Sequence, residues 1–174
     1  MRLKAMKVHV AGISSTFIDW PDPISQAVIV FIAGCHHDCE GCQSLKLKEE
    51  SNFVAIDIDD LSNSLYDELI LQRTNKLIFS GGDPLYRLEE VKYLIADLRN
   101  KVKDLQICIY TGFKYDEIKN QVNGLFDFIK TGMFDMNKRQ QEGKTDFQIV
   151  LASTNQEFWD KNGNKLSENG IYKF

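Results

Sequence analysis

The sequence predicts an α/β protein with a mostly parallel sheet. Short apolar segments alternate with amphipathic helical patterns, and this alternation is typical of βαβ units with right-handed crossovers. The chain has 174 residues, about one domain, whereas a complete eight-stranded βα barrel needs at least about 200 residues. We therefore expect a partial βα barrel whose sheet is open at one side. It would form a single domain over residues 1–174, with a cysteine loop at 34–43, a polar loop at about 135–146 and a C-terminal tail at about 157–174.

The first half of the chain predicts two strands and a helix. Lys7–Ile13 is expected to form an edge strand, and the unbroken apolar run Ala27–Ala33 is typical of a fully buried strand. Asp57 can cap a helix, because apolar residues follow it at steps of three and four. These are Ile58, Leu61, Leu65 and Leu69.

The second half repeats this unit. A short apolar strand over Lys76–Ser80 ends in the turn sequence Gly81-Gly82-Asp83-Pro84, and a second amphipathic helix follows it. That helix carries its apolar side chains at Leu88, Val91, Leu94, Ile95 and Leu98. Further strands are expected at Gln106–Tyr110, Leu125–Ile129 and Phe147–Ala152, with a short helix at Tyr115–Val122.

Composition excludes some classes of function. The 21 basic and 25 acidic residues are mixed along the chain and leave a net charge of −4, so no basic face for nucleic acid is expected. No segment approaches the roughly 20 apolar residues of a membrane span, and we expect a cytoplasmic protein without a membrane partner. In a reducing cytosol, clustered cysteines indicate metal or redox chemistry rather than a disulfide framework.

Three of the four cysteines follow the buried strand directly. Cys35, Cys39 and Cys42 have the spacing C-x3-C-x2-C. Three thiolates on one loop can ligate three irons of a [4Fe–4S] cluster and leave the fourth iron open for a substrate. Zinc is the alternative, with His36 or His37 completing a Cys3His set, although structural zinc sites usually take their ligands from two separated pairs. The spacing favours the cluster over zinc.

Other polar residues have a structural interpretation. Cys108 lies inside an apolar strand and is expected to be a buried hydrophobic residue. His36 and His37 are expected to be exposed. His9 is expected to be structural, and Asn155 can cap a strand end.

The cysteine pattern after a buried strand is identified as the signature of radical S-adenosylmethionine enzymes. The chain resembles their glycyl-radical-activating branch, most of all the activases of anaerobic ribonucleotide reductases. The resemblance extends from about Phe17 to Trp159, with departures from the family pattern at Gln43, Thr131 and Leu151. The segments that carry it, besides the cysteines, are Ser80-Gly81-Gly82-Asp83-Pro84-Leu85, Tyr110-Thr111-Gly112-Phe113 and Ser153-Thr154-Asn155-Gln156.

The resemblance implies two cofactors. A [4Fe–4S] cluster on Cys35, Cys39 and Cys42 would bind S-adenosylmethionine through its open iron, and one electron would then release a 5′-deoxyadenosyl radical. Gly81 and Gly82 would let the backbone approach the methionine moiety, and Asp83 would accept a hydrogen bond from its ammonium group. The full set of cofactor contacts implied by the resemblance is Gly41, Gly81, Gly82, Asp83, Thr111, Ser153 and Asn155.

The resemblance also implies partners. The substrate would be a glycine α-hydrogen on a large anaerobic reductase subunit, and flavodoxin or ferredoxin would supply the electron. The rim facing the reductase would include Asp127, Gly132, Met133 and Phe134. Alternatives are a radical enzyme acting on another glycyl-radical enzyme or on a small molecule, as 7-carboxy-7-deazaguanine synthases do, and a non-enzymatic iron–sulfur or zinc module.

Overall fold

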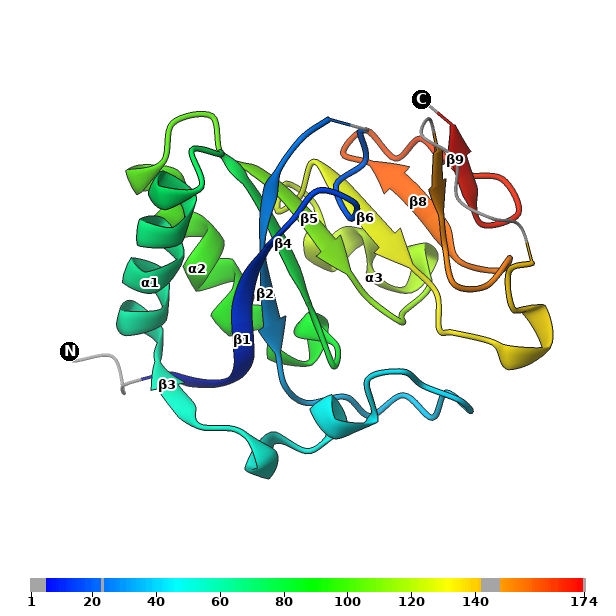
Figure 1. Ribbon diagram of the computed structural model, residues 1–174, viewed down its shortest axis with the longest axis horizontal. Coiled ribbons are helices and arrows are strands. Elements are labelled where there is room, and N and C mark those ends of the chain that lie inside the picture. Colours follow the sequence, from blue (N-terminus) through cyan, green and yellow to red (C-terminus); the bar gives the residue numbers. More distant parts are fainter. Residues whose placement is uncertain (1–5, 23, 142–147, 174) are drawn as a thin grey trace.

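A seven-stranded sheet in the order β3-β1-β2-β4-β5-β6-β8 forms the centre of the computed structural model (Figure 1). The structure describes residues 6–22, 24–141 and 148–173. The strands of the sheet are β1 (Lys7–Thr16), β2 (Ala27–Ile32), β3 (Ala55–Asp57), β4 (Lys76–Gly81), β5 (Gln106–Tyr110), β6 (Phe128–Thr131) and β8 (Glu157–Asp160). The helices are α1 (Ile58–Leu71), α2 (Leu88–Lys101) and α3 (Tyr115–Val122), with short 3₁₀ turns η1 (Leu45–Lys48), η2 (Glu50–Asn52), η3 (Pro84–Arg87) and η4 (Met136–Lys138).

The central strands run parallel. β2, β4, β5 and β6 pair in parallel in that order, whereas β1 and β8 join them antiparallel. The sheet is open, with β3 and β8 at its edges. The protein is therefore mixed α/β with a mostly parallel sheet. That this sheet is an incomplete barrel stays a prediction.

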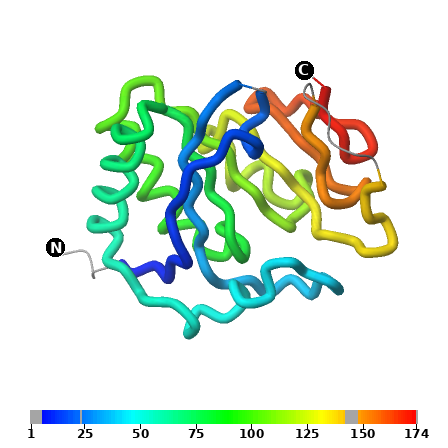
Figure 2. Tube along the Cα trace, in the orientation of Figure 1, coloured from blue at the N-terminus to red at the C-terminus, as the bar shows by residue number. Residues whose placement is uncertain are grey.

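Helices cover one face of the sheet, as the alternating pattern requires. The Asp57 side chain accepts a hydrogen bond from the Asp59 backbone N–H at 3.1 Å and so caps α1 where expected. α1 and α2 lie side by side against the strands (Figures 1 and 2). Their buried residues, with the facing side chains of β2, β4, β5 and β6, form the larger hydrophobic core. The buried apolar residues of α1 and α2 are Ile58, Leu61, Leu65, Leu69, Val91, Leu94, Ile95 and Leu98.

The opposite face of the sheet carries a second, smaller core. Cys108 of β5 is completely buried there, as expected, together with Ile78 of β4. Trp20, from the connection between β1 and β2, covers part of this face. Ile149 and Leu151 cover another part, and they come from the C-terminal region.

Three details of the strand prediction differ from the structure. β1 is not an edge strand, because β3 pairs with its outer side through Lys7–His9. β6 begins at Phe128 rather than at Leu125. Phe147 lies outside the described residues, and the strand expected after it is β7 (Gln148–Val150). β7 pairs with β9 (Ile171–Lys173) in a separate two-stranded sheet and is not part of the main sheet.

The C-terminal tail also contains an unexpected strand. β8 pairs antiparallel with β6 along its whole length, from Phe128–Asp160 to Thr131–Glu157. Its end at Asp160 starts the predicted turn, where the carboxylate accepts hydrogen bonds from the backbone of Asn162 and Asn164. Residues 157–173 therefore supply the last strand of the sheet, β8, and part of the second core.

Candidate iron–sulfur and cofactor site

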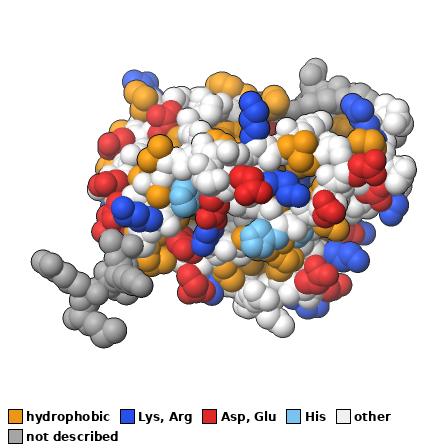
Figure 3. All heavy atoms as spheres, turned by 90° about the horizontal axis from the view of Figure 1, so that it is seen from below, with side chains coloured by type: hydrophobic (Ala, Val, Ile, Leu, Met, Phe, Trp, Pro, Cys, Tyr) orange, Lys and Arg blue, Asp and Glu red, His pale blue; other side chains and the backbone are white. Residues whose placement is uncertain are grey.

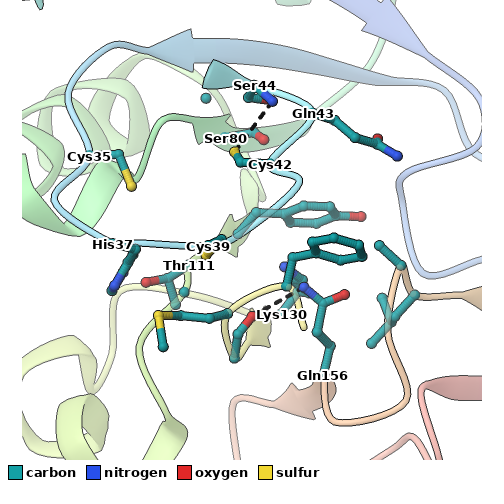
Figure 4. Close-up of a pocket in the computed structure, with 18 of the residues that line it drawn as sticks. Cys35, His37, Cys39, Cys42, Gln43, Ser44, Ser80, Thr111, Lys130 and Gln156 are labelled. Carbon is teal, nitrogen blue, oxygen red and sulfur yellow. Dashed lines mark hydrogen bonds between the residues drawn. The ribbon is translucent and has the colours of Figure 1, made fainter. Parts of the chain in front are cut away.

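A pocket of about 460 Å³ opens at the carboxyl ends of the parallel strands. Cys35, Cys39 and Cys42 all line it, and they lie in the loop that follows β2 (Figure 4). Lys130 and Gln156 line the pocket on the side opposite Cys35 and Cys42 (Figure 4). The carboxyl ends of parallel strands are the usual place for a ligand in open α/β sheets.

Backbone contacts hold the cysteine loop against the sheet edge. The Gly34 N–H donates to the Leu47 carbonyl at 2.7 Å, and the Asp83 N–H donates to the Gly34 carbonyl at 2.9 Å. Glu50 further along this loop pairs with Arg87 of η3 and lies 3.4 Å from His9 of β1. His9 is therefore structural, as expected.

The thiols of the loop are partly buried. Burial raises the pKa of Cys35 above the usual value, and a hydrogen bond from the His37 N–H partly offsets this rise. The pKa of Cys39 is raised for the same reason, with a hydrogen bond from the Phe134 N–H acting against it. A raised pKa favours the protonated thiol, so metal or cluster binding would release a proton from each of these cysteines.

Asp83 does not face the pocket. Its side chain is completely buried, and its carboxylate accepts hydrogen bonds from the Thr111 hydroxyl at 2.9 Å and from the N–H groups of Gly112 and Leu85 at 2.8 and 3.0 Å. The His37 Nε2 lies 2.7 Å from the same carboxylate and must donate, because an ionised carboxylate only accepts. In this arrangement Asp83 joins the cysteine loop to the β5 end, and its contact with the cofactor ammonium stays a prediction.

His37 is correspondingly not exposed. Its side chain is only 11% exposed, and its ring packs edge-on against Phe113, with centroids 4.7 Å apart. Gly112 leaves room for this ring, since a Cβ there would lie 2.5 Å from the imidazole. His36 is exposed as expected and stacks on Tyr86. In the described part of the chain, no group of three His, Cys, Asp or Glu side chains is arranged to hold a single metal ion.

Gly81 and Gly82 line the pocket, but neighbouring backbone explains why they are glycines. A Cβ on Gly81 would lie 2.2 Å from the Ile32 carbonyl oxygen, and Gly81 has a φ of +123°, which L side chains rarely adopt. A Cβ on Gly82 would lie 2.5 Å from the Gly34 carbonyl oxygen. These glycines let the end of β4 pack against β2 and the cysteine loop.

The other residues implied as cofactor contacts are divided between pocket and surroundings. Thr111 lines the pocket, whereas Gly41, Ser153 and Asn155 do not. Gly41 provides space for Met136 of η4, since a Cβ would lie within 1.9 Å of its methyl group. Ser153 is completely buried and accepts a hydrogen bond from the Asp135 N–H, and Asn155 donates to the Met133 carbonyl at 2.9 Å.

Gln156 and Lys130 are polar pocket residues that were not among the predicted contacts. Gln156 is buried, and its amide group holds the turn after β6 by donating to the Gly132 carbonyl at 3.1 Å. Lys130 of β6 is the register partner of Tyr110 and directs its charge over that ring, at 5.9 Å from the centroid. The sequence signal that could have identified Lys130 as a pocket residue is its position in a short strand that begins with two apolar residues.

Three of the four residues expected at a partner-facing rim lie together in the structure. Gly132, Met133 and Phe134 line the pocket at the carboxyl end of β6. Asp127 precedes β6, and its carboxylate accepts a hydrogen bond from the Ile107 N–H at the start of β5. Placing it at the rim was wrong, because it lies at the opposite end of the sheet.

Comparison with known proteins identifies the family. The family model of a 4Fe–4S single cluster domain matches residues 26–167, which include the cysteine loop and every pocket-lining strand end. The chain belongs to this 4Fe–4S single cluster family. The whole cysteine loop lies inside the matched range.

Curated relatives share one name, anaerobic ribonucleoside-triphosphate reductase-activating protein. The relative from Enterobacteria phage T4 is 28% identical over 138 residues, covering 76% of this chain and 82% of the relative. Those from Haemophilus influenzae and Vibrio cholerae are 31% and 28% identical over 104 and 105 residues, covering 58% of this chain and 66% of each relative. The resemblance expected from the motifs is confirmed.

The surface around the cluster segment is mixed in charge. Seen from the side of the cysteine loop, acidic and basic side chains are interspersed with hydrophobic ones (Figure 3).

No helix in the described ranges is both long enough and apolar enough to cross a membrane.

Proposed function

We propose that this protein is an activase that uses a [4Fe–4S] cluster and S-adenosylmethionine to generate a glycyl radical on an anaerobic ribonucleotide reductase. The observation that carries the proposal is the convergence of Cys35, Cys39 and Cys42 on one pocket with the Gly81-Gly82 turn. The names of the relatives support the reductase as the partner.

The residues of the pocket suit both cofactors. Three thiols can each ligate one iron and leave a fourth iron open, and the remaining volume is in the range of small-molecule sites. Thr111 and the backbone of Gly81 and Gly82 line the part of the pocket that would hold S-adenosylmethionine. When bound, the two cofactors supply a one-electron cleavage of the sulfonium bond that yields methionine and a 5′-deoxyadenosyl radical. The chain contributes ligands, orientation and exclusion of water.

A protein partner is supported by the pocket rim. Ile18 and Met133 line the pocket and are 63% and 44% exposed, so apolar surface is available beside the opening. Such a rim could receive a reductase loop carrying the glycine, with a low-potential donor such as flavodoxin or ferredoxin supplying the electron.

We further propose that the open sheet is an incomplete barrel that leaves lateral access. The four free cysteines are consistent with a cytoplasmic location.

Anaerobic reconstitution tests the proposal. We expect absorbance near 400 nm, release of 5′-deoxyadenosine after reduction with S-adenosylmethionine, and a glycyl-radical signal by electron paramagnetic resonance after mixing with the host reductase. Cys39→Ala should lose the cluster and the cleavage together. Cys108→Ala is the matched control, because Cys108 is buried in the second core and should leave both unchanged.

The same measurements separate the alternatives. Tightly bound stoichiometric zinc without cleavage would leave only a metal-binding module. Cleavage without a glycyl radical on a competent reductase would point to another glycyl-radical enzyme or a small-molecule substrate.

A further inference from the structure

Backbone N–H groups of the cysteine loop donate to two of its own sulfurs. The Ser44 N–H donates to the Cys42 sulfur at 3.4 Å, and the His37 N–H donates to the Cys35 sulfur. Each donor follows its acceptor by two residues, so both bonds come with the local turn of the loop. Hydrogen bonds to the cysteine sulfurs help to set the reduction potential of an iron–sulfur cluster, because they stabilise the more negative, reduced form.

The third sulfur takes its donor from a distant segment. The Phe134 N–H donates to the Cys39 sulfur, and Phe134 belongs to the connection that follows β6. Gly132, Met133 and Phe134 line the pocket at the rim that we expect to face the reductase. This bond therefore joins the rim to a cluster ligand, which the two local bonds do not.

Close packing fixes the rim segment against the cysteine loop. A Cβ on Gly41 would lie 1.9 Å from the Met136 methyl group and 3.6 Å from the Phe134 ring. Gly41 stands between Cys39 and Cys42 in the loop. Packed contacts of this kind transmit displacements, so a shift of the rim segment would change the distance between the Phe134 nitrogen and the Cys39 sulfur.

The same segment offers apolar surface to a partner. Met133 is 44% exposed and Met136 is 45% exposed. The Asn155 amide donates to the Met133 carbonyl at 2.9 Å and so ties the segment to the C-terminal region. A partner that covered both methionines would press on a segment held between this tie and Gly41.

We propose that the Phe134 N–H raises the reduction potential of the cluster through Cys39, and that a reductase docked on Met133 and Met136 strengthens this effect by shortening the contact. The inference rests on the proposed function. Reduction would then be most favourable when the substrate glycine is at the pocket, which limits cleavage of S-adenosylmethionine without a substrate. Phe134 is a positioning residue in this scheme, because its backbone acts on a ligand of the cluster.

Redox titration of the reconstituted holoproteins, followed by electron paramagnetic resonance, tests the first part. Phe134→Pro removes the N–H, whereas Phe134→Ala removes only the ring. We expect reduction to be about tenfold less favourable in Phe134→Pro, a shift of about 59 mV for a one-electron couple, and to change far less in Phe134→Ala. Ser44→Pro is the matched control, because it removes the local donor to Cys42 and should also lower the potential.

Repeating the titration with the large reductase subunit tests the coupling. The potential should rise in wild type, in Phe134→Ala and in Ser44→Pro, but not in Phe134→Pro. The docked subunit excludes water from the pocket in all four proteins, so this difference isolates the Phe134 N–H. Met136→Ala keeps every backbone donor and should show a smaller rise than wild type, which provides a test if Phe134→Pro does not fold or bind iron.

Equal potentials of Phe134→Pro and Phe134→Ala at equal iron content would overturn the role of the N–H. A wild-type potential that the reductase leaves unchanged, or a full rise in Met136→Ala, would overturn the coupling. These results would leave the proposed function intact, as long as wild type forms the glycyl radical with a chemical reductant. If wild type neither cleaved S-adenosylmethionine nor formed the radical, the proposed function itself would fail.

Discussion

At the scale of single residues, Asp83 changes its role between sequence and structure. A Gly-Gly-Asp turn beside a cofactor predicts an acceptor for the cofactor, but the carboxylate is enclosed by donors from three segments. Its contact with His37 fixes the middle of the cysteine loop. Groups that orient metal ligands in this way commonly change metal affinity by 10- to 100-fold when they are removed.

Asp83→Ala should therefore weaken the cluster itself. We expect the absorbance near 400 nm to disappear roughly tenfold faster in the presence of an iron chelator, because four buried donors lose their acceptor and the loop loosens. His37→Phe should share this loss, whereas His37→Gln keeps a donor and should lose less. If Asp83→Ala retained the cluster as wild type does and lost only affinity for S-adenosylmethionine, the original contact with the ammonium would be correct.

At the scale of elements, the end of β4 depends on backbone packing. Gly81→Ala should lower the free energy of unfolding by about 2–4 kcal/mol, because a Cβ would collide with the Ile32 carbonyl at a positive φ. Gly12→Ala is the control, since no atom lies within 4 Å of a Cβ there, and it should change stability by less than about 1 kcal/mol. Urea denaturation of both variants provides the comparison. Equal stability of Gly81→Ala and wild type would show that the strand end can move apart.

A helix or strand can be predicted from sequence when its own residues show a clear apolar period. α1 and α2 are amphipathic over 14 residues each and were located from periodicity alone. β8 and β9 contain four and three residues, too few to show a period. Their pairing depends on β6 and β7, which are distant in sequence.

At the scale of the whole molecule, the cysteine loop contacts the segment after β6. The Phe134 N–H donates to the Cys39 sulfur, and Gly41 packs against Met136. Cluster binding should therefore slow hydrogen–deuterium exchange in residues 35–44 and also at 134–138. Helix α1 lies outside the pocket, so its exchange should be unchanged and serves as the internal reference. Protection confined to residues 35–44 would show that the two segments are not coupled.

The sequence by itself determined the α/β class with a mostly parallel sheet, the position of the cysteine loop after β2 and the family, because each depends on residue types at short spacings. Only the tertiary structure decided which side chains enter the pocket. It turns Asp83 inward, places Asp127 at the far end of the sheet and aims Lys130 at the pocket. Strand register and the packing of distant segments set these directions, so no local pattern could predict them.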